Sequence, residues 1–260
     1  MSENKYTATD LKEMQKWPLE QKIQVAQTRI LEYGIRFNEQ IFVAFSGGKD
    51  STVLLDLVRR VYPDAPAVFI DTGLEYPEIK QFVKSHENVE VIRPSRSFKQ
   101  VLEEFGYPVV SKKIAGYVAT AKRNPDSARA KYLSGEYERT MFGFGNGKWN
   151  YLVDAPFKIS DWCCDVMKKQ PNHAYSRRTG RVPILGNLAE ESVARRNEWM
   201  RSGCNLFDSK KPTSKPLSIW TNNDILEYIV RFNIPYCPIY GDIVKDKKGR
   251  WTTTGVERTG

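Results

Sequence analysis

One short stretch of the sequence combines residue types suited to holding a phosphate group. Residues 46–51 read S-G-G-K-D-S and stand between two apolar runs, residues 41–45 and residues 52–58. Two glycines allow backbone N–H groups to turn towards an anion, and the N-terminus of a following helix carries partial positive charge. Lys49 adds a mobile cation, and either of the two residues after it can cap the helix. The stretch therefore predicts a phosphate-holding loop between a strand and a helix.

The spacing of this stretch separates it from two better-known phosphate loops. In the Walker A pattern a glycine stands five residues before a Gly-Lys-Ser or Gly-Lys-Thr triplet, whereas here Lys49 is followed by Asp50. The dinucleotide fingerprint needs a third glycine at a fixed offset, and the sequence has none there. Kinase-like or GTPase-like chemistry and dinucleotide binding are therefore both disfavoured.

The elements that must position this loop alternate along the chain as strand, helix and strand. Such alternation predicts an α/β fold, a parallel sheet with right-handed crossovers and helices on both faces, and a ligand at the carboxyl ends of the strands. Strands are expected over residues 41–45, 67–70, 89–92 and 182–186. Helices are expected over residues 9–37, 52–58, 77–84, 163–170, 189–200 and 222–232, with Pro171 ending the fourth of them and Thr221 capping the last.

Length and composition indicate one domain over residues 1–260. With 260 residues, 40% hydrophobic and 27% charged, the chain can bury one good core, or one core and a smaller lobe. Between residues 106 and 150 the periodicity weakens, so we expect an inserted, partly helical segment that serves as a lid or a partner surface. An N-terminal helical segment, residues 8–38, precedes the sheet, and residues 160–243 form the C-terminal half.

The net charge of +9 favours anionic partners. The basic residues are spread along the chain, so a solvated surface and a nucleic-acid interface both stay open. The sequence has no apolar window of about 18 residues and no signal-peptide core at its start. We therefore expect a cytoplasmic protein that does not enter a membrane.

Several motifs, in order between residues 20 and 243, resemble a known family. Residues 46–51 resemble the PP-loop of N-type ATP pyrophosphatases, and D-T-G-L-E-Y-P-E at residues 71–78 resembles a segment of phosphoadenosine phosphosulfate (PAPS) reductases. Residues 186–195, G-N-L-A-E-E-S-V-A-R, are similar to the phosphate-contacting turn of that family. The resemblance implies an adenine nucleotide α-hydrolase-like fold, the PP-loop fold, and an adenine nucleotide as ligand.

The resemblance also implies a set of site residues. Lys49, Asp50, Asp71 and Arg195 are the candidate catalytic residues. The candidate nucleotide-binding residues are Ser46, Gly47, Gly48, Lys49, Asp50, Ser51, Asp71, Thr72, Gly73, Gly186, Glu191, Ser192 and Arg195. Asp71 could position Mg²⁺ or a ribose hydroxyl, or it could be a simple turn residue. Arg195 suits phosphate or sulfate oxygens, or alternatively a surface ion pair with Glu191.

The four cysteines raise the question of an iron–sulfur cluster. Cys163 and Cys164 are adjacent and resemble a CC segment of adenosine phosphosulfate (APS) reductases, which implies a [4Fe-4S] cluster with both as ligands. Cys204 and Cys237 could complete a set of four only if the fold brings them together. Residues 253–260 look like the opening of a TG-x-x-RTGCxxC segment, so two further ligands are expected beyond residue 260. Buried, inert cysteines are the alternative.

Three functions stay open. We favour an enzyme that splits ATP between the α and β phosphates to activate an acceptor for sulfur transfer, as in tRNA or DNA thiolation, because the complete loop suits a pyrophosphate leaving group. This reading implies a nucleic-acid or protein acceptor, a sulfur-donor protein and Mg²⁺, and it leaves a homo-oligomer open. The alternatives are an APS or PAPS reductase that produces sulfite, and a non-catalytic nucleotide- or nucleic-acid-binding component.

Overall fold

The computed structural model of the chain describes residues 4–136 and 147–259 and divides into two compact units. Unit 1 runs up to residue 92 and resumes at residue 172, and unit 2 comprises residues 93–171. The expected insertion, residues 106–150, falls within unit 2, and its residues 137–146 lie outside the described ranges. Among the described residues, no helix has the length and apolar character needed to cross a membrane.

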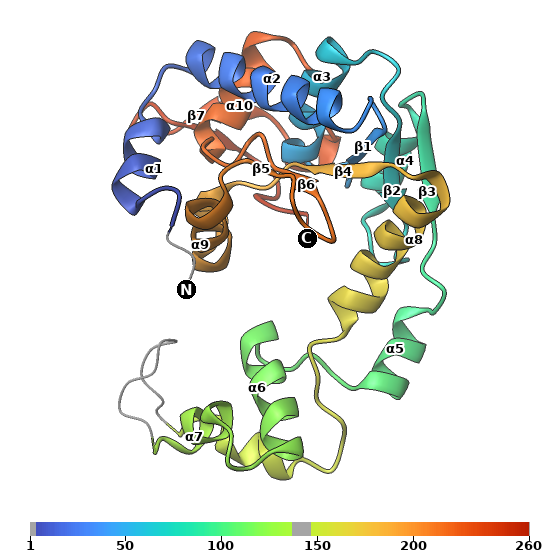
Figure 1. Cartoon of the computed structure of the whole chain (residues 1–260), viewed down its shortest axis with the longest axis vertical. Coiled ribbons are helices and arrows are strands. Elements are labelled where there is room, and N and C mark those ends of the chain that lie inside the picture. Colours follow the sequence, from blue (N-terminus) through green and yellow to red (C-terminus); the bar gives the residue numbers. More distant parts are fainter. Residues whose placement is uncertain (1–3, 137–146, 260) are drawn as a thin grey trace. The chain divides into compact units, whose positions relative to one another are not determined.

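Unit 1 is built on a six-stranded sheet (Figure 1). Its strands are β1 (Ile41–Ala44), β2 (Ala67–Ile70), β3 (Val89–Ile92), β4 (Val182–Leu185), β5 (Asn205–Leu206) and β6 (Thr213–Ser214). They lie in the order β3-β2-β1-β4-β6-β5, and every neighbouring pair is parallel except β5 with β6. The expected parallel α/β sheet is confirmed, and the antiparallel edge strand β5 extends it.

Helices cover both faces of this sheet. Unit 1 contains α1 (Ala8–Gln15), α2 (Leu19–Arg36), α3 (Lys49–Val61), α4 (Pro77–Lys84), α9 (Val193–Ser202) and α10 (Asn222–Arg231), together with most of α8 (Gln170–Thr179). In Figure 1, α2, α3 and α10 lie on the same side of the sheet. Their apolar side chains join Ile41, Val43 and Ile184 in the main core. On the other face, Tyr175 of α8 packs its ring on Phe42, with 4.7 Å between ring centroids.

Proline affects the helices in two ways. Residues 9–37 are mostly helical, as expected, but they form two helices, and Pro18 is the residue immediately before α2. The prediction that Pro171 ends the helix begun near Cys163 is wrong, because a π-helical stretch (Asp165–Lys169) leads directly into α8. Pro171 has no N–H, and its ring would clash with a carbonyl one turn earlier in a regular α-helix. The wider π turn before it makes room for the ring.

Two serine or threonine caps fix the helices that follow β4 and β6. The expected helix over residues 189–200 is divided into a 3-10 turn (Ala189–Glu191) and α9, because Ser192 caps α9 by accepting the N–H of Arg195 at 3.2 Å. The predicted cap of α10 is confirmed, since Thr221 Oγ1 accepts the N–H of Asp224 at 3.3 Å. These caps set where the helices begin relative to the sheet edge.

Unit 2 has its own apolar core. It contains α5 (Phe98–Phe105), α6 (Lys112–Arg123), α7 (Ala128–Ser134) and a 3-10 turn (Asn150–Asp154). The core side chains are Ile114, Ala115, Tyr117, Val118, Ala121, Leu133, Leu152 and Ile159.

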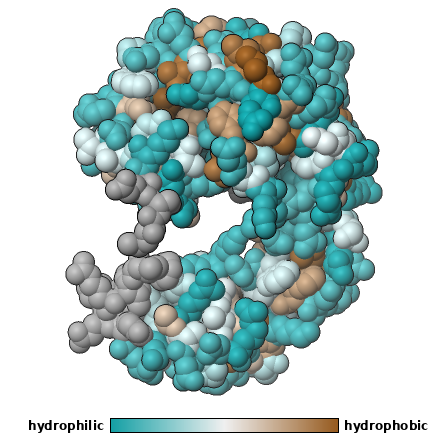
Figure 2. All heavy atoms as spheres, in the orientation of Figure 1, coloured by the Kyte–Doolittle hydropathy of each residue, from teal (hydrophilic) through white to brown (hydrophobic). Residues whose placement is uncertain are grey.

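Unit 1 ends in a 3-10 turn (Pro238–Tyr240) and a hairpin of β7 (Ile243–Lys245) and β8 (Trp251–Thr253). On the face drawn in Figure 2, hydrophilic residues cover most of each unit.

Candidate phosphate-binding site

The loop at residues 46–51 connects β1 to α3 at the carboxyl edge of the sheet. Gly47 has φ +72°, a left-handed conformation that residues with a side chain rarely adopt. A Cβ atom at this position would lie 2.9 Å from methyl groups of both Ile79 and Val83. Gly47 therefore lets the chain turn tightly against α4.

Helix α3 begins with Gly48 as its N-cap, and this residue supplies no side-chain cap. The prediction that Asp50 or Ser51 caps the helix is wrong, because the Ser51 hydroxyl instead donates to the Gly48 carbonyl at 2.9 Å. Ser51 Oγ also lies 3.2 Å from the Ser46 N–H, so Ser46 and Ser51 brace the loop across its base. The N–H groups of Gly48 and Lys49 donate to the hydroxyl groups of Ser46 and Tyr240, at 3.4 and 3.2 Å, so an anion bound at this helix start would replace these hydroxyl acceptors.

The buried Lys49 and the partly buried Asp50 form a charged pair at this helix start. Lys49 is 4% exposed, and its Nζ lies 3.5 Å from the Asp50 carboxylate. Asp50 Oδ1 is buried and accepts no hydrogen bond among the described residues. A buried carboxylate oxygen without a donor is costly, so the site favours a ligand that brings a cation or a donor to it.

Asp71 lies at the end of the neighbouring strand, β2, where it has partners of its own. It forms an ion pair with Lys80 of α4, with 2.8 Å between Nζ and Oδ1, and it accepts the N–H of Gly73 at 3.1 Å. The N–H and hydroxyl of Thr72 both donate to Glu75, at 3.0 and 2.6 Å. The structure therefore places Asp71, Thr72 and Gly73 in a braced turn at the same sheet edge as the loop, with the Asp71 charge balanced by Lys80.

The turn after β4 touches the first turn of α3 directly. A Cβ atom on Gly186 would lie 3.1 Å from the Asp50 carbonyl oxygen and 3.3 Å from the Ser51 Cα. This contact brings the segment that carries Glu191, Ser192 and Arg195 beside the loop, as the motifs predict. The candidate residues of the two motifs therefore meet at one edge of unit 1.

Arg195 forms an ion pair with Glu191, and Glu191 also accepts a hydrogen bond from Arg258. The ion pair with Glu191, which the sequence left open as the alternative role of Arg195, is therefore present. Burial, followed by the nearby Arg258 charge, lowers the pKa of the Arg195 guanidinium, while Asp50 acts in the opposite direction. Two guanidinium groups therefore share one carboxylate beside the loop.

Three further residues lie near the loop that the sequence did not predict as part of the site. Tyr240 accepts the N–H of Lys49 at 3.2 Å, and its hydroxyl lies 3.1 Å from Thr259 Oγ1. Burial raises the pKa of Tyr240. Arg258 and Thr259 lie within residues 253–260, a segment whose resemblance to other proteins indicates only the cysteine ligands expected after it. No motif marks Tyr240, which the fold brings in from a separate turn.

Cys163 and Cys164 belong to unit 2, whereas Cys204 and Cys237 belong to unit 1. Within residues 4–136 and 147–259, no three His, Cys, Asp or Glu side chains lie together as metal ligands would. Cys237 is buried, and burial raises its pKa. In unit 2, burial and the adjacent Cys164 raise the pKa of Cys163. An iron–sulfur cluster with Cys163 and Cys164 as ligands therefore stays a prediction from the sequence.

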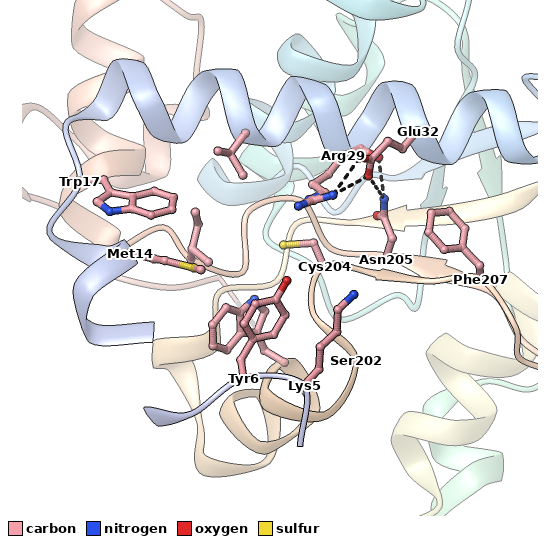
Figure 3. A pocket seen from close by; sticks show the side chains of 13 residues that line it. Lys5, Tyr6, Met14, Trp17, Arg29, Glu32, Ser202, Cys204, Asn205 and Phe207 are labelled. Atoms are coloured by element: carbon pink, nitrogen blue, oxygen red, sulfur yellow. Dashed lines mark hydrogen bonds and ion pairs between the residues drawn. The ribbon is translucent and has the colours of Figure 1, made fainter. Parts of the chain in front are cut away.

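Cys204 lines a separate cavity of about 150 Å³ in unit 1 (Figure 3). Its side chain lies between the group formed by Arg29, Glu32 and Asn205 and the ring of Tyr6. Burial raises the pKa of this thiol to about 11. Cys204 is therefore a neutral thiol near pH 7 and not a ready thiolate nucleophile.

Comparisons with known proteins relate the chain to one kind of enzyme domain. Residues 40–125 and 130–243 match the phosphoadenosine phosphosulfate reductase domain. A phosphoadenosine 5′-phosphosulfate reductase of Alkalilimnicola ehrlichii is 37% identical over 222 residues, which cover 83% of this chain and 71% of that protein. A shorter similarity, 39% over 75 residues, to the uncharacterized protein MJ0973 of Methanocaldococcus jannaschii covers 27% of this chain and 18% of that protein. The Candida auris phosphoadenylyl-sulfate reductase, solved as a phosphate complex, is 15% identical with a TM-score of 0.47, covering 86% of this chain and 89% of that one.

Proposed function

Because this chain belongs to the phosphoadenosine phosphosulfate reductase domain family, as its motifs predict, we propose that it binds an adenosine phosphosulfate and reduces the sulfo group to sulfite. The observation that carries the proposal is the meeting at one sheet edge of three groups: a helix start whose N-cap residue supplies no side-chain cap, the buried Lys49, and the half-exposed Arg195. Together they supply the amide and cationic groups that a polyanionic ligand needs. This reading replaces ATP-dependent sulfur transfer as the leading proposal, because the family match and the reductase relative favour reduction.

The proposed reaction exchanges one bond to sulfur for another. A thiolate forms a bond to the sulfo sulfur, and the bond from that sulfur to the phosphate oxygen breaks, so that the adenosine phosphate leaves as an anion. A second thiol then forms a disulfide with the first and releases sulfite, and a dithiol donor thereby supplies both electrons. Cys204 and Cys237 are poor sources of the thiolate, because burial raises the pKa of both thiols.

The chain's own residues would act mainly on the departing phosphate. The α3 start and Lys49 lie where they would stabilise the negative charge that grows on its oxygens, and such stabilisation by one group is worth about 2 to 4 kcal/mol of barrier. Gly186 keeps the β4 turn close enough for Arg195 to join them. Catalysis of this kind depends on positions fixed before the substrate arrives.

A second candidate function, cleavage of ATP between the α and β phosphates, is favoured by one specific observation. Among the described residues, no group donates a hydrogen bond to the buried Asp50 Oδ1, which faces only the Lys49 ammonium at 3.5 Å, and such an oxygen suits contact with Mg²⁺. Asp50 would then supply one ligand, and phosphate oxygens and water the others. The bound ion would neutralise charge on the leaving pyrophosphate, and the activated acceptor would be a nucleic acid or a protein.

One experiment separates the two candidates. The purified protein is incubated with APS, with PAPS, and with ATP and Mg²⁺, each in the presence of dithiothreitol, and sulfite and pyrophosphate are measured. Sulfite from APS or PAPS supports the proposed reductase, whereas pyrophosphate from ATP alone supports the second candidate. Release of neither product contradicts both proposals.

Replacement of Lys49 tests whether the loop is the working site. Lys49→Ala should lower the rate of the measured reaction by roughly 30- to 1,000-fold, because it removes a buried cation beside the departing phosphate. Lys16→Ala is the control, since Lys16 is an exposed residue paired with Glu13, and it should leave the rate unchanged. An unchanged rate in a folded Lys49→Ala protein would show that the reaction occurs elsewhere.

A further inference from the structure

The segment around residue 258 lies directly over the phosphate loop. Thr259 Oγ1 lies 3.1 Å from the position that a Cβ atom on Gly48 would occupy, and also 3.1 Å from the hydroxyl oxygen of Tyr240. The Tyr240 hydroxyl in turn accepts the N–H of Lys49, the first residue of α3. Tyr240 is 2% exposed, so this contact is a buried part of the fold and fixes the segment over the loop.

Arg258 reaches from this segment to the carboxylate that holds Arg195. Oε2 of Glu191 pairs with Arg195, and Oε1 of Glu191 pairs with Arg258. Oε2 also accepts the N–H of Leu188 at 2.9 Å. The Glu191 side chain is 13% exposed, whereas the side chains of Arg195 and Arg258 are 38% and 52% exposed, so the carboxylate is sheltered while both guanidinium groups are within reach of a ligand from solvent. One carboxylate thus faces two guanidinium groups and a backbone donor.

The charges of this group do not balance. Two guanidinium groups carry +2 and Glu191 carries −1. The nearby carboxylates of Asp50 and Glu198 are paired with Lys49 and Lys215, so one positive charge is left over next to the loop. The two arginines repel each other, and this repulsion lowers the pKa of Arg195 in addition to the larger effect of burial. A bound oxyanion would offset the surplus charge, and guanidinium groups bind phosphate and sulfate oxygens in pairs of hydrogen bonds.

We propose that Arg258 is part of the nucleotide site, where it acts with Arg195 on the anionic group beyond the α-phosphate, while Glu191 holds both side chains in place. This inference rests on the proposed function, since it assumes that an adenine nucleotide occupies the loop. It adds a ligand-binding group from the end of the sequence to those from β1 and β4. The group recognised is the terminal sulfate of APS or the second phosphate of ADP, which share the same oxyanion chemistry.

A purely structural role is the alternative. In that case Arg258 only fastens the segment over the loop through Glu191, and its loss would weaken the binding of every adenine nucleotide to the same extent. The proposed role instead requires a loss that depends on the ligand. AMP lacks the group beyond the α-phosphate, so comparison of AMP with longer nucleotides separates the two roles.

The experiment is calorimetric titration of the full chain with AMP, ADP and APS. Arg258→Gln should weaken binding of ADP and APS by about 10- to 100-fold, because a charge-assisted hydrogen bond is lost, and should change AMP binding by less than about threefold. Arg231→Gln is the matched control, since Arg231 is a comparably exposed arginine that pairs with one carboxylate, Glu20, and it should bind all three like the wild type. Arg258→Lys keeps the charge and should lie between Arg258→Gln and the wild type.

The outcomes are distinguishable. Equal losses for the three ligands, or no loss for any of them, in folded Arg258 variants would overturn the role of Arg258 and leave the proposed function standing. Failure of the wild type to bind AMP, ADP and APS would overturn both. If Arg258→Gln does not fold, the same comparison with Arg258→Lys decides the question.

Discussion

At the scale of single residues, Gly186 links the two halves of the candidate site. It follows β4, and its Cα faces the backbone of the first turn of α3 at Asp50 and Ser51. Backbone atoms cannot move aside as a flexible side chain can, so any side chain at position 186 must push the two segments apart. The loop geometry that holds a phosphate therefore depends on this position as much as on the loop's own glycines.

Gly186→Ala should weaken nucleotide binding by about tenfold or more and lower the free energy of unfolding by about 1 to 3 kcal/mol. The added Cβ would lie 3.1 to 3.3 Å from backbone atoms of α3, so the helix start would have to shift away from the ligand. Titration with ADP and urea unfolding would measure the two effects.

Gly180→Ala provides the control for Gly186→Ala. Gly180 precedes β4 at the opposite edge of the sheet, has φ +73°, and has no atom within 4 Å of an added Cβ. This variant should lose about 1 kcal/mol of stability to backbone strain and bind ADP normally. Normal ADP binding by Gly186→Ala as well would contradict the steric argument.

At the scale of elements, a buried ion pair fastens α2 to α10. Lys22 Nζ lies 2.7 Å from Asp224 Oδ2 and also donates to the Gln15 carbonyl at 2.7 Å. Asp224 Oδ2 accepts the N–H and the hydroxyl of Thr221 as well, at 2.6 and 2.8 Å. The carboxylate therefore caps α10 and joins it to α2. Both helices pack in the main core beside α3, whose N-terminus is the candidate site.

Lys22→Met should lower the free energy of unfolding by about 3 to 5 kcal/mol, because it leaves the buried Asp224 carboxylate without a counter-charge. Lys16→Met removes an exposed ion pair with Glu13 and should change the same quantity by less than about 1 kcal/mol. Urea unfolding monitored by circular dichroism compares the two. A Lys22→Met effect as small as that of Lys16→Met would show that water reaches the pair.

Elements with a strong periodic pattern were predictable from the sequence, and short ones were not. The apolar runs of β1 to β4 and the cap of α10 lie where the sequence indicates. Strands β5 and β6 have two residues each, too few to produce an alternation. The helix through Pro171 departs from the rule that a proline ends an α-helix. The rule depends on regular α-helical geometry, which the π turn before Pro171 changes.

The residues of the candidate site also divide into those that the sequence predicts and those that it does not. Loop residues such as Gly47 and Lys49 were predicted because their chemistry and spacing are local. The sequence did not predict Tyr240 and Arg258, since each reaches the site through a contact between segments that are far apart along the chain. It did not predict the Lys80 partner of Asp71 either, because that ion pair depends on how α4 packs against the end of β2. Only the folded chain shows which surplus charges and hydroxyl groups lie beside the loop.

At the scale of the whole molecule, the chain divides into two compact units, and each unit has a core of its own. The main core of unit 1 lies around the sheet, and unit 2 has a core of its own built from α6, α7 and their neighbours. All the loop, strand-end and arginine groups of the candidate site belong to unit 1. Units with separate cores unfold as separate cooperative transitions when the contacts between them are weak.

We therefore expect differential scanning calorimetry to resolve two transitions, and ADP to raise the temperature of only one. Leu133→Ala removes a buried side chain of unit 2 and should lower one transition, whereas Ile30→Ala in α2 should lower the other, each by about 2 to 5 kcal/mol of stability. Because a ligand stabilises the state to which it binds, ADP should raise the transition that Ile30→Ala lowers. A single transition that both substitutions and ADP shift together would contradict this expectation and show that the two units fold as one.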